Sequence, residues 1–211
     1  MPHIIDSLAG LLYRFGPAAS TVFPDGWGDR VTVEMLADPE SITHPVAPAE
    51  VVWGRKEERV GHRLIRGQFT SPVAELLPLE SRVVPTELIE PAVGSSRVVV
   101  LLPAWNDHGF EQRRRLAALL LEYGIASLMF DIPLYGGRRV TTAQQQAIRT
   151  VADFALMGFG AVQEAKALLS SLDASKTSGV AGFSMGGNLS AIVGAVHDDP
   201  IAITALAASQ R

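Results

Sequence analysis

The chain has 211 residues, of which 47% are hydrophobic and 19% are charged, and its formal net charge is −4. This length and composition support one large domain or two small ones with a real core, and they exclude a disordered tail. Because the chain has no cysteine, a disulfide scaffold, a zinc–thiolate site and a cysteine nucleophile are also excluded. The weakly acidic charge, without any basic stripe, argues against nucleic-acid binding.

Targeting and cofactor signals are absent from the sequence. The N-terminus, Met1–Asp6, lacks a basic segment followed by an apolar one, which argues against a signal peptide. No apolar run approaches the roughly 20 residues that a bilayer-spanning helix needs. No metal-binding or cofactor-binding motif stands out. We therefore expect a cytoplasmic protein with no transmembrane segment, no metal and no cofactor.

Residues 1–62 form an irregular front section with frequent proline and glycine, and we expect it to be an N-terminal extension that packs on the core. One helical face is predicted here by four apolar residues at helical spacing: Leu8, Leu11, Leu12 and Phe15. The charged residues Lys56–Arg59 are typical of a solvated run.

Regular elements follow from residue 63. The ranges 63–70 and 83–89 predict an antiparallel pair of strands, and 97–102 predicts a strand buried on both faces. Helices and strands then alternate: helix 110–123, strand 126–130, helix 142–172 with a break near Gly158–Gly160, strand 178–183, helix 185–196 and strand 201–208. This alternation favours the α/β class, with a parallel sheet and helices on both faces.

The most informative motif is Gly-x-Ser-x-Gly at residues 182–186, between a predicted strand and a predicted helix. A nucleophile elbow has this context, because its sharp turn needs small residues such as Gly182 and Gly186 beside the serine. Ser184 would then present its Oγ at a helix N-terminus, where the helix dipole favours developing negative charge. The alternatives are a glycine-rich packing turn and a phosphate-binding turn; the latter is disfavoured because the Rossmann and P-loop patterns are absent.

An elbow of this kind needs two backbone N–H groups to hold an oxyanion. One donor would be Met185, directly after the serine, and the other would come from the loop after an earlier central strand, here residues 102–108. Pro103 has no N–H, so Ala104 or Trp105 is the expected donor. The alternative is an ordinary connecting loop in which Trp105 only fills the core.

Several segments, in consistent order between residues 60 and 190, resemble the α/β-hydrolase superfamily and, more closely, the α/β-hydrolase domain-containing protein 18 family. The segments are Gly67–Pro72, Leu77–Ser81, Asp107-His108 with Arg113–Arg115, Ala126–Leu128 with Tyr135–Arg138, Asp153-Phe154 with Met157-Gly158, and Gly182–Gly187. The resemblance implies a three-layer α/β/α sandwich of α/β-hydrolase type. It also implies a serine-hydrolase site, for which lipid-like or other acyl esters are a reasonable substrate class.

The general base and the anion-binding residues are less well defined. In hydrolases of this fold the acid and the histidine of the catalytic triad follow the serine in the chain. Here His197 would lie at the far end of the helix that begins after Ser184, roughly 18 Å from the serine. His108 is therefore the candidate base, and loop shaping is its alternative role. Arg138 and Arg139 could contact an anionic substrate group, and a solvated loop is the alternative. The cluster Arg113–Arg115 could also meet such a group, but we expect it to be a solvated helix face.

We therefore predict that residues 63–211 form the N-terminal portion of an α/β-hydrolase core. About eight strands are usual for this fold and about six are predicted, so we expect the C-terminal strands to be lacking. The predicted function is a serine-type hydrolase for a small ester-like or lipid-like acyl substrate, incomplete as given. The alternative is a catalytically inactive binding or interaction protein with this fold. The final strand would leave an apolar edge, which predicts a homodimer.

Overall fold

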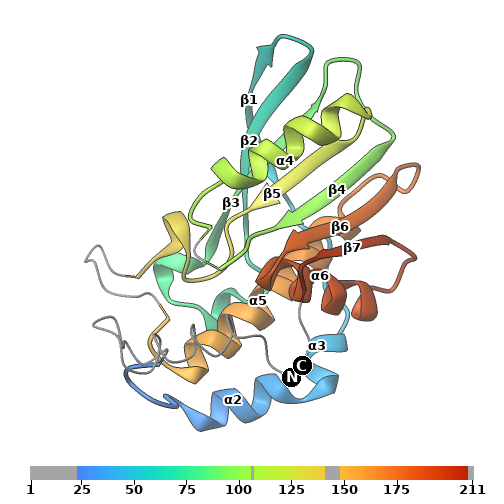
Figure 1. The fold of residues 1–211 in the computed structure, drawn as a ribbon. Helices are drawn as coiled ribbons and strands as arrows, with labels where there is room; N and C mark the ends of the chain where they lie inside the picture. Colours follow the sequence, from blue (N-terminus) through green and yellow to red (C-terminus); the bar gives the residue numbers. More distant parts are fainter. Residues whose placement is uncertain (1–22, 106, 141–147, 209–211) are drawn as a thin grey trace, which may run out of the picture.

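The computed structural model describes residues 23–105, 107–140 and 148–208, and within them the chain forms one seven-stranded sheet (Figure 1). Its strands are β1 (Val52–Arg59), β2 (His62–Thr70), β3 (Val83–Pro91), β4 (Arg97–Leu102), β5 (Ala126–Phe130), β6 (Thr177–Phe183) and β7 (Ala202–Leu206). They lie in the order β1-β2-β3-β5-β4-β6-β7. The four strands β5, β4, β6 and β7 pair in parallel, in that order across the sheet. Strands β1, β2 and β3 pair antiparallel with their neighbours. Both the predicted antiparallel pair and the predicted parallel region are confirmed.

Helices cover both faces of this sheet, so the predicted three-layer α/β/α arrangement is confirmed. Helix α4 (Glu111–Glu122) packs on one face, where Ala117 meets Leu101 and Met129 in a buried cluster. Helices α5 (Val151–Ser170) and α6 (Met185–Val196) pack on the other face and contribute to the larger core (Figure 1). Because the central strands are covered twice, their side chains are apolar without alternation.

Helix α5 corrects one prediction, since it continues without a break through Gly158 and Gly160. Its start is fixed by a capping box between Thr150 and Asp153. A Cβ on Gly160 would lie 2.7 Å from Pro133, so the glycine allows the helix to pass closely over the loop after β5. Residues 142–147 of the predicted helix lie outside the described residues.

The front section contains two helices that were not predicted from the sequence, α2 (Arg30–Ala37) and α3 (Pro39–Thr43). Asp29 caps α2 by accepting a hydrogen bond from the backbone of Val31, and Asp38 caps α3 in the same way. These two aspartates were the available signal for the two helix starts. The helix predicted from Leu8, Leu11, Leu12 and Phe15 lies outside the described residues.

The front section also supplies an edge strand of the sheet. The charge run Lys56–Arg59 is largely solvent-exposed, as predicted, and it belongs to β1. Charged side chains on an edge strand discourage pairing with other chains, which explains this composition. Strand β1 pairs with β2 across the predicted division between residues 62 and 63, and that division stays a prediction.

Strand β7 forms the opposite edge of the described sheet. All five of its residues are exposed, including Ile203 and Leu206. The predicted contact between two copies through this edge stays a prediction. Among the described helices, none combines the length and the apolar character that crossing a bilayer requires.

Candidate active site

Ser184 forms the sharp turn that joins β6 to α6, in the position expected from the Gly-x-Ser-x-Gly motif. Its φ is 54° and its ψ is −116°, a backbone conformation that non-glycine residues rarely adopt. Two backbone hydrogen bonds hold the turn: Ser184 N donates to the carbonyl of Leu206 on β7 at 2.9 Å, and Asn188 N donates to the carbonyl of Ser184 at 3.1 Å. A strained serine at a helix N-terminus is a feature that functional sites often retain.

Two glycines permit this turn because other backbone lies where their side chains would be. A Cβ on Gly182 would lie 2.3 Å from the carbonyl carbon of Gly186. A Cβ on Gly186 would lie 2.5 Å from the carbonyl oxygen of Leu102 and 2.8 Å from that of Pro103. The first turn of α6 therefore packs directly against the beginning of the loop that follows β4. This contact brings the loop that contains Ala104 beside the first turn of α6.

A cavity of about 510 Å³ opens next to Ser184. It is bounded by α5, by the first turns of α6, by Trp105 and by side chains of the front section, among them Val33, Leu36 and Ile42. Apart from Ser184 and Asn188, the described residues that line the cavity are apolar or glycine, and none of these is charged. The contribution of the front section was not predicted from the sequence, because helices α2 and α3 were not expected there.

Aromatic side chains form the wall of this cavity next to the loop after β4. The Trp105 ring lies 5.9 Å from that of Phe154 and 6.1 Å from that of Tyr135, measured between centroids. The exposed His108 ring stacks on Tyr135 at 5.0 Å and is absent from the cavity lining. Among the described residues, no hydrogen bond joins His108 to Ser184, and the role of His108 as a base stays a prediction.

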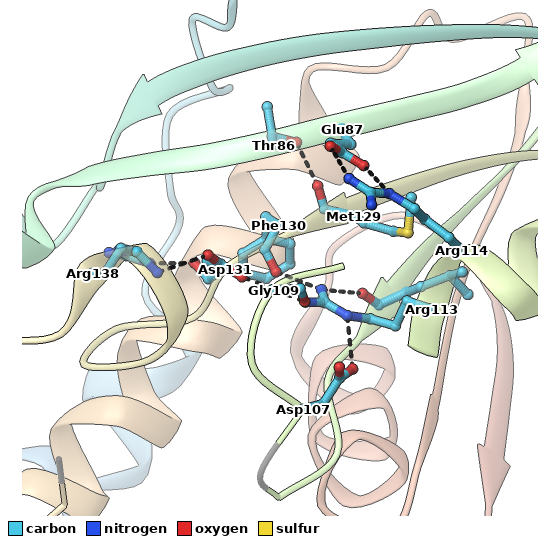
Figure 2. Close-up of polar contacts among 12 residues, drawn as sticks. Thr86, Glu87, Asp107, Gly109, Arg113, Arg114, Met129, Phe130, Asp131 and Arg138 are labelled. Atoms are coloured by element: carbon cyan, nitrogen blue, oxygen red, sulfur yellow. Dashed lines mark hydrogen bonds and ion pairs between the residues drawn. The ribbon is translucent and has the colours of Figure 1, made fainter. Parts of the chain in front are cut away.

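The arginine cluster on α4 corrects another expectation, because Arg113 is buried rather than solvated. Its side chain is only 5% exposed, and its Nε donates to Asp107 Oδ2 at 3.0 Å (Figure 2). Its Nη2 also lies 3.6 Å from Asp131 Oδ1. Arg114 binds Glu87 on β3, and Arg115 is the exposed member of the cluster.

Arg138 is also buried, so the structure contradicts both its predicted contact with substrate and the alternative of a solvated loop. Its side chain forms a two-bond pair with the Glu164 carboxylate on α5, at 2.8 and 2.6 Å. It also donates to the backbone carbonyls of Ser81 and Asp131. No signal in the local sequence marked this burial, although Glu164 inside an apolar helix was a sign of a buried partner. Arg139 is partly buried, and its predicted contact with an anion stays a prediction.

Burial shifts the pKa values of two charged groups beside the loop, Arg113 and Asp131. Burial lowers the pKa of Arg113, while the carboxylates of Asp107 and Asp131 oppose that shift. Burial raises the pKa of Asp131, and the N–H of Gly137 and the charge of Arg113 oppose it. Arginine keeps its proton in such surroundings, so a buried cation lies next to the loop.

The far end of α6 carries the one histidine that follows Ser184. His197 lies at the C-terminus of the 12-residue helix, as expected from the sequence, and its Nδ1 lies 3.2 Å from the backbone N of Asp199. The helix separates the two residues by its full length. In the described part of the chain, no cluster of three or more His, Asp or Glu residues could hold a metal ion.

The sheet order, the two helical layers and the serine on a strand–helix turn together define an α/β-hydrolase fold. Solved structures support this class. One is a cold-adapted esterase from an Arctic intertidal metagenomic library, at 25% identity and a TM-score of 0.52, with 68% of this chain and 60% of that chain covered. Another is acetyl xylan esterase 1 from Thermoanaerobacterium sp., at 13% identity and a TM-score of 0.51, with 80% and 55% covered. The chain thus spans about 60% or less of the length of these esterases.

Within this class, the family model described as alpha/beta hydrolase domain containing 18 matches residues 20–211. The chain therefore belongs to that family, which confirms the resemblance that the sequence motifs indicated.

Proposed function

We propose that this protein is a serine-type hydrolase that cleaves esters with an apolar acyl group, and that Ser184 is its nucleophile. The observation that carries the proposal is the strained Ser184 turn at the edge of an uncharged cavity of about 510 Å³. A serine hydroxyl in this position can reach a carbonyl group while the acyl chain is kept away from water.

In the proposed reaction, Ser184 Oγ attacks the ester carbonyl carbon and gives its proton to a base. The negative charge on the carbonyl oxygen is held by the N–H of Met185 and by that of Ala104 or Trp105, with help from the α6 dipole. The bond to the alcohol then breaks, and the alcohol leaves with a proton. Water hydrolyses the resulting acyl-serine and regenerates Ser184. His108 is the candidate base within this chain.

The substrate class follows from the lining of the cavity. A charged acyl group would lose its hydration there without gaining an opposite charge from the described lining residues, none of which is charged. An apolar chain gains from burial against Leu36 on α2 and Met157 on α5, and against their neighbours. We propose that the front section contributes one wall of the acyl pocket and so takes part in substrate choice.

The proposal is tested by hydrolysis of p-nitrophenyl esters of increasing acyl length, from acetate through butyrate to octanoate. We expect kcat/KM to rise by up to about fourfold for each added methylene until the cavity is full. Ser184→Ala should abolish the activity, and Ser175→Ala, at an exposed serine before β6, should leave it unchanged. Equal activity of wild type and Ser184→Ala would remove Ser184 from the mechanism.

A second candidate is a binding protein that keeps the hydrolase fold without catalysis. It is favoured by one observation: among the described residues, no histidine bonds to Ser184. Both candidates bind an apolar ester in the same cavity, but only the enzyme releases p-nitrophenol. Binding of a fluorescent fatty ester without any Ser184-dependent turnover would therefore select the binding protein.

A further inference from the structure

Arg113 is a buried cation beside the loop 103–109, and the proposed chemistry gives it no direct task. A buried guanidinium must direct its N–H groups to acceptors, because an unpaired buried donor is costly. Its acceptors therefore show which parts of the molecule this side chain holds together.

The acceptors of Arg113 come from the loop and from both strands beneath it. On the loop, Nε binds the Asp107 carboxylate at 3.0 Å and Nη2 binds the carbonyl of Gly109. On the strands, Nη1 binds the carbonyl of Phe130 at the end of β5 at 2.6 Å, and that of Leu101 near the end of β4 at 3.4 Å. One side chain thus ties the later part of the loop to the ends of the two strands (Figure 2).

The earlier part of the loop is fixed in another way, by the close packing of Gly186 against Leu102 and Pro103. The proposed oxyanion donors lie between these two attachments. Asp107 also closes the intervening turn, because its backbone N donates to the carbonyl of Ala104 at 3.1 Å. A displacement of Asp107 would therefore move the segment that carries the donor.

We propose that the Asp107–Arg113 pair is a positioning device that holds residues 103–105 and 107–109, the described part of the loop after β4, in the shape in which Ala104 or Trp105 meets the oxyanion. This inference rests on the proposed role of Ser184. The pair is suited to the task because both side chains are buried, at 6% and 5% exposure, so that salt screens them weakly. The Asp131 carboxylate, 3.6 Å from Arg113, adds a second negative charge that keeps the cation in place.

The test compares Asp107→Ala with Asp107→Asn, which keeps an oxygen acceptor for Arg113 Nε. Hydrogen exchange of the peptide spanning the loop and the hydrolysis of p-nitrophenyl butyrate are measured for both. We expect Asp107→Ala to speed exchange in the loop and to lower kcat by about tenfold to a hundredfold with KM little changed, since misplaced donors affect the transition state. Asp107→Asn should recover part of kcat, because it keeps the acceptor for Arg113 Nε but loses the negative charge.

Arg115→Gln is the matched control, because Arg115 is an exposed residue of the same helix and, among the described residues, its ion pair is with Glu111. It should leave both loop exchange and kcat unchanged. If Asp107→Ala does not fold, Arg113→Lys provides the second variant: it keeps the charge, but an ammonium cannot reach all the acceptors of a guanidinium. We expect it to raise loop exchange and lower kcat in the same way.

The outcomes separate this inference from the proposed function. Unchanged loop exchange, or faster exchange with unchanged kcat, in a folded Asp107→Ala protein overturns the positioning role. A rise in KM with constant kcat also overturns it, because the pair would then act on ground-state binding. If the wild type shows no Ser184-dependent hydrolysis, the proposed function fails and the catalytic part of this inference fails with it. The exchange data still decide whether the pair holds the loop.

Discussion

The two segments proposed to bind the oxyanion are held in place by different forces. The turn at residues 182–187 is fixed by contact, since backbone occupies the space where a side chain on Gly182 or Gly186 would be. The described part of the loop after β4, residues 103–105 and 107–109, is fixed by charge, through the buried pair of Asp107 and Arg113. The close packing at the turn does not depend on pH, and it leaves no room for added atoms. The ion pair at the loop tolerates changes in shape, but it depends on the ionisation of its two side chains.

This difference separates the two segments experimentally. A side chain added to the turn should damage the molecule at every pH, whereas a change among the buried charges should alter how stability depends on pH. The next two predictions use this contrast, the larger effect first.

Gly186→Ala places a Cβ within 2.5 Å of the Leu102 carbonyl, and rigid backbone cannot move away cheaply. We expect a loss of about 3 kcal/mol in the free energy of unfolding, measured by urea denaturation. The loss should be the same from pH 4 to pH 8. Gly158→Ala is the control, because a Cβ there meets nothing within 4 Å inside helix α5, and we expect it to stabilise by about 0.5–1 kcal/mol. Similar effects of the two variants would contradict the packing argument.

Asp131→Asn tests the charge-held segment through pH. Burial raises the pKa of Asp131 in the folded protein above its value in the unfolded chain. At pH values between these two pKa values, the folded protein therefore holds a proton on Asp131 that the unfolded chain has lost. Stability from this group is therefore fully present below the ordinary pKa of about 4 and falls as pH rises through the folded pKa. The free energy of unfolding of wild type minus that of Asp131→Asn should decrease as pH rises from 4.

The measurement is urea denaturation of both proteins at a series of pH values. The quantity compared is how the difference between their free energies of unfolding changes with pH, not its size at one pH. A difference that stays flat, or that increases with pH, would show that Asp131 is not destabilised in its charged form. Arg115→Gln, at an exposed position, should give no such slope.

The same contrast explains what could be predicted from the sequence. The contact-held turn was predictable because glycine spacing records close approach directly, so Ser184 was placed on a strand–helix turn in advance. The charge-held loop was not, because Arg113 stands in a run of three arginines that is typical of a solvated face. Its burial depends on Asp131 and on the ends of β4 and β5, and only the fold brings these groups together.

Arg138 was misinterpreted for the same reason, since its partners Ser81 and Glu164 are distant in sequence. The strands of the central sheet were predictable because uninterrupted apolar runs mark burial on both faces. Helices α2 and α3 were missed because their capping aspartates lie among prolines and glycines that favour a loop. The cavity wall that they form could therefore not be inferred without the fold.

The central claim is that Ser184 is an activated nucleophile, and labelling with a fluorophosphonate tests it most directly. Such a probe forms a phosphorus–oxygen bond with a reactive serine and releases fluoride. Intact-mass spectrometry detects the added mass of the probe on the protein. We predict one label on the wild type and on Ser175→Ala, and none on Ser184→Ala. Labelling of Ser184→Ala at the wild-type rate, or no labelling of folded wild type, would contradict the account.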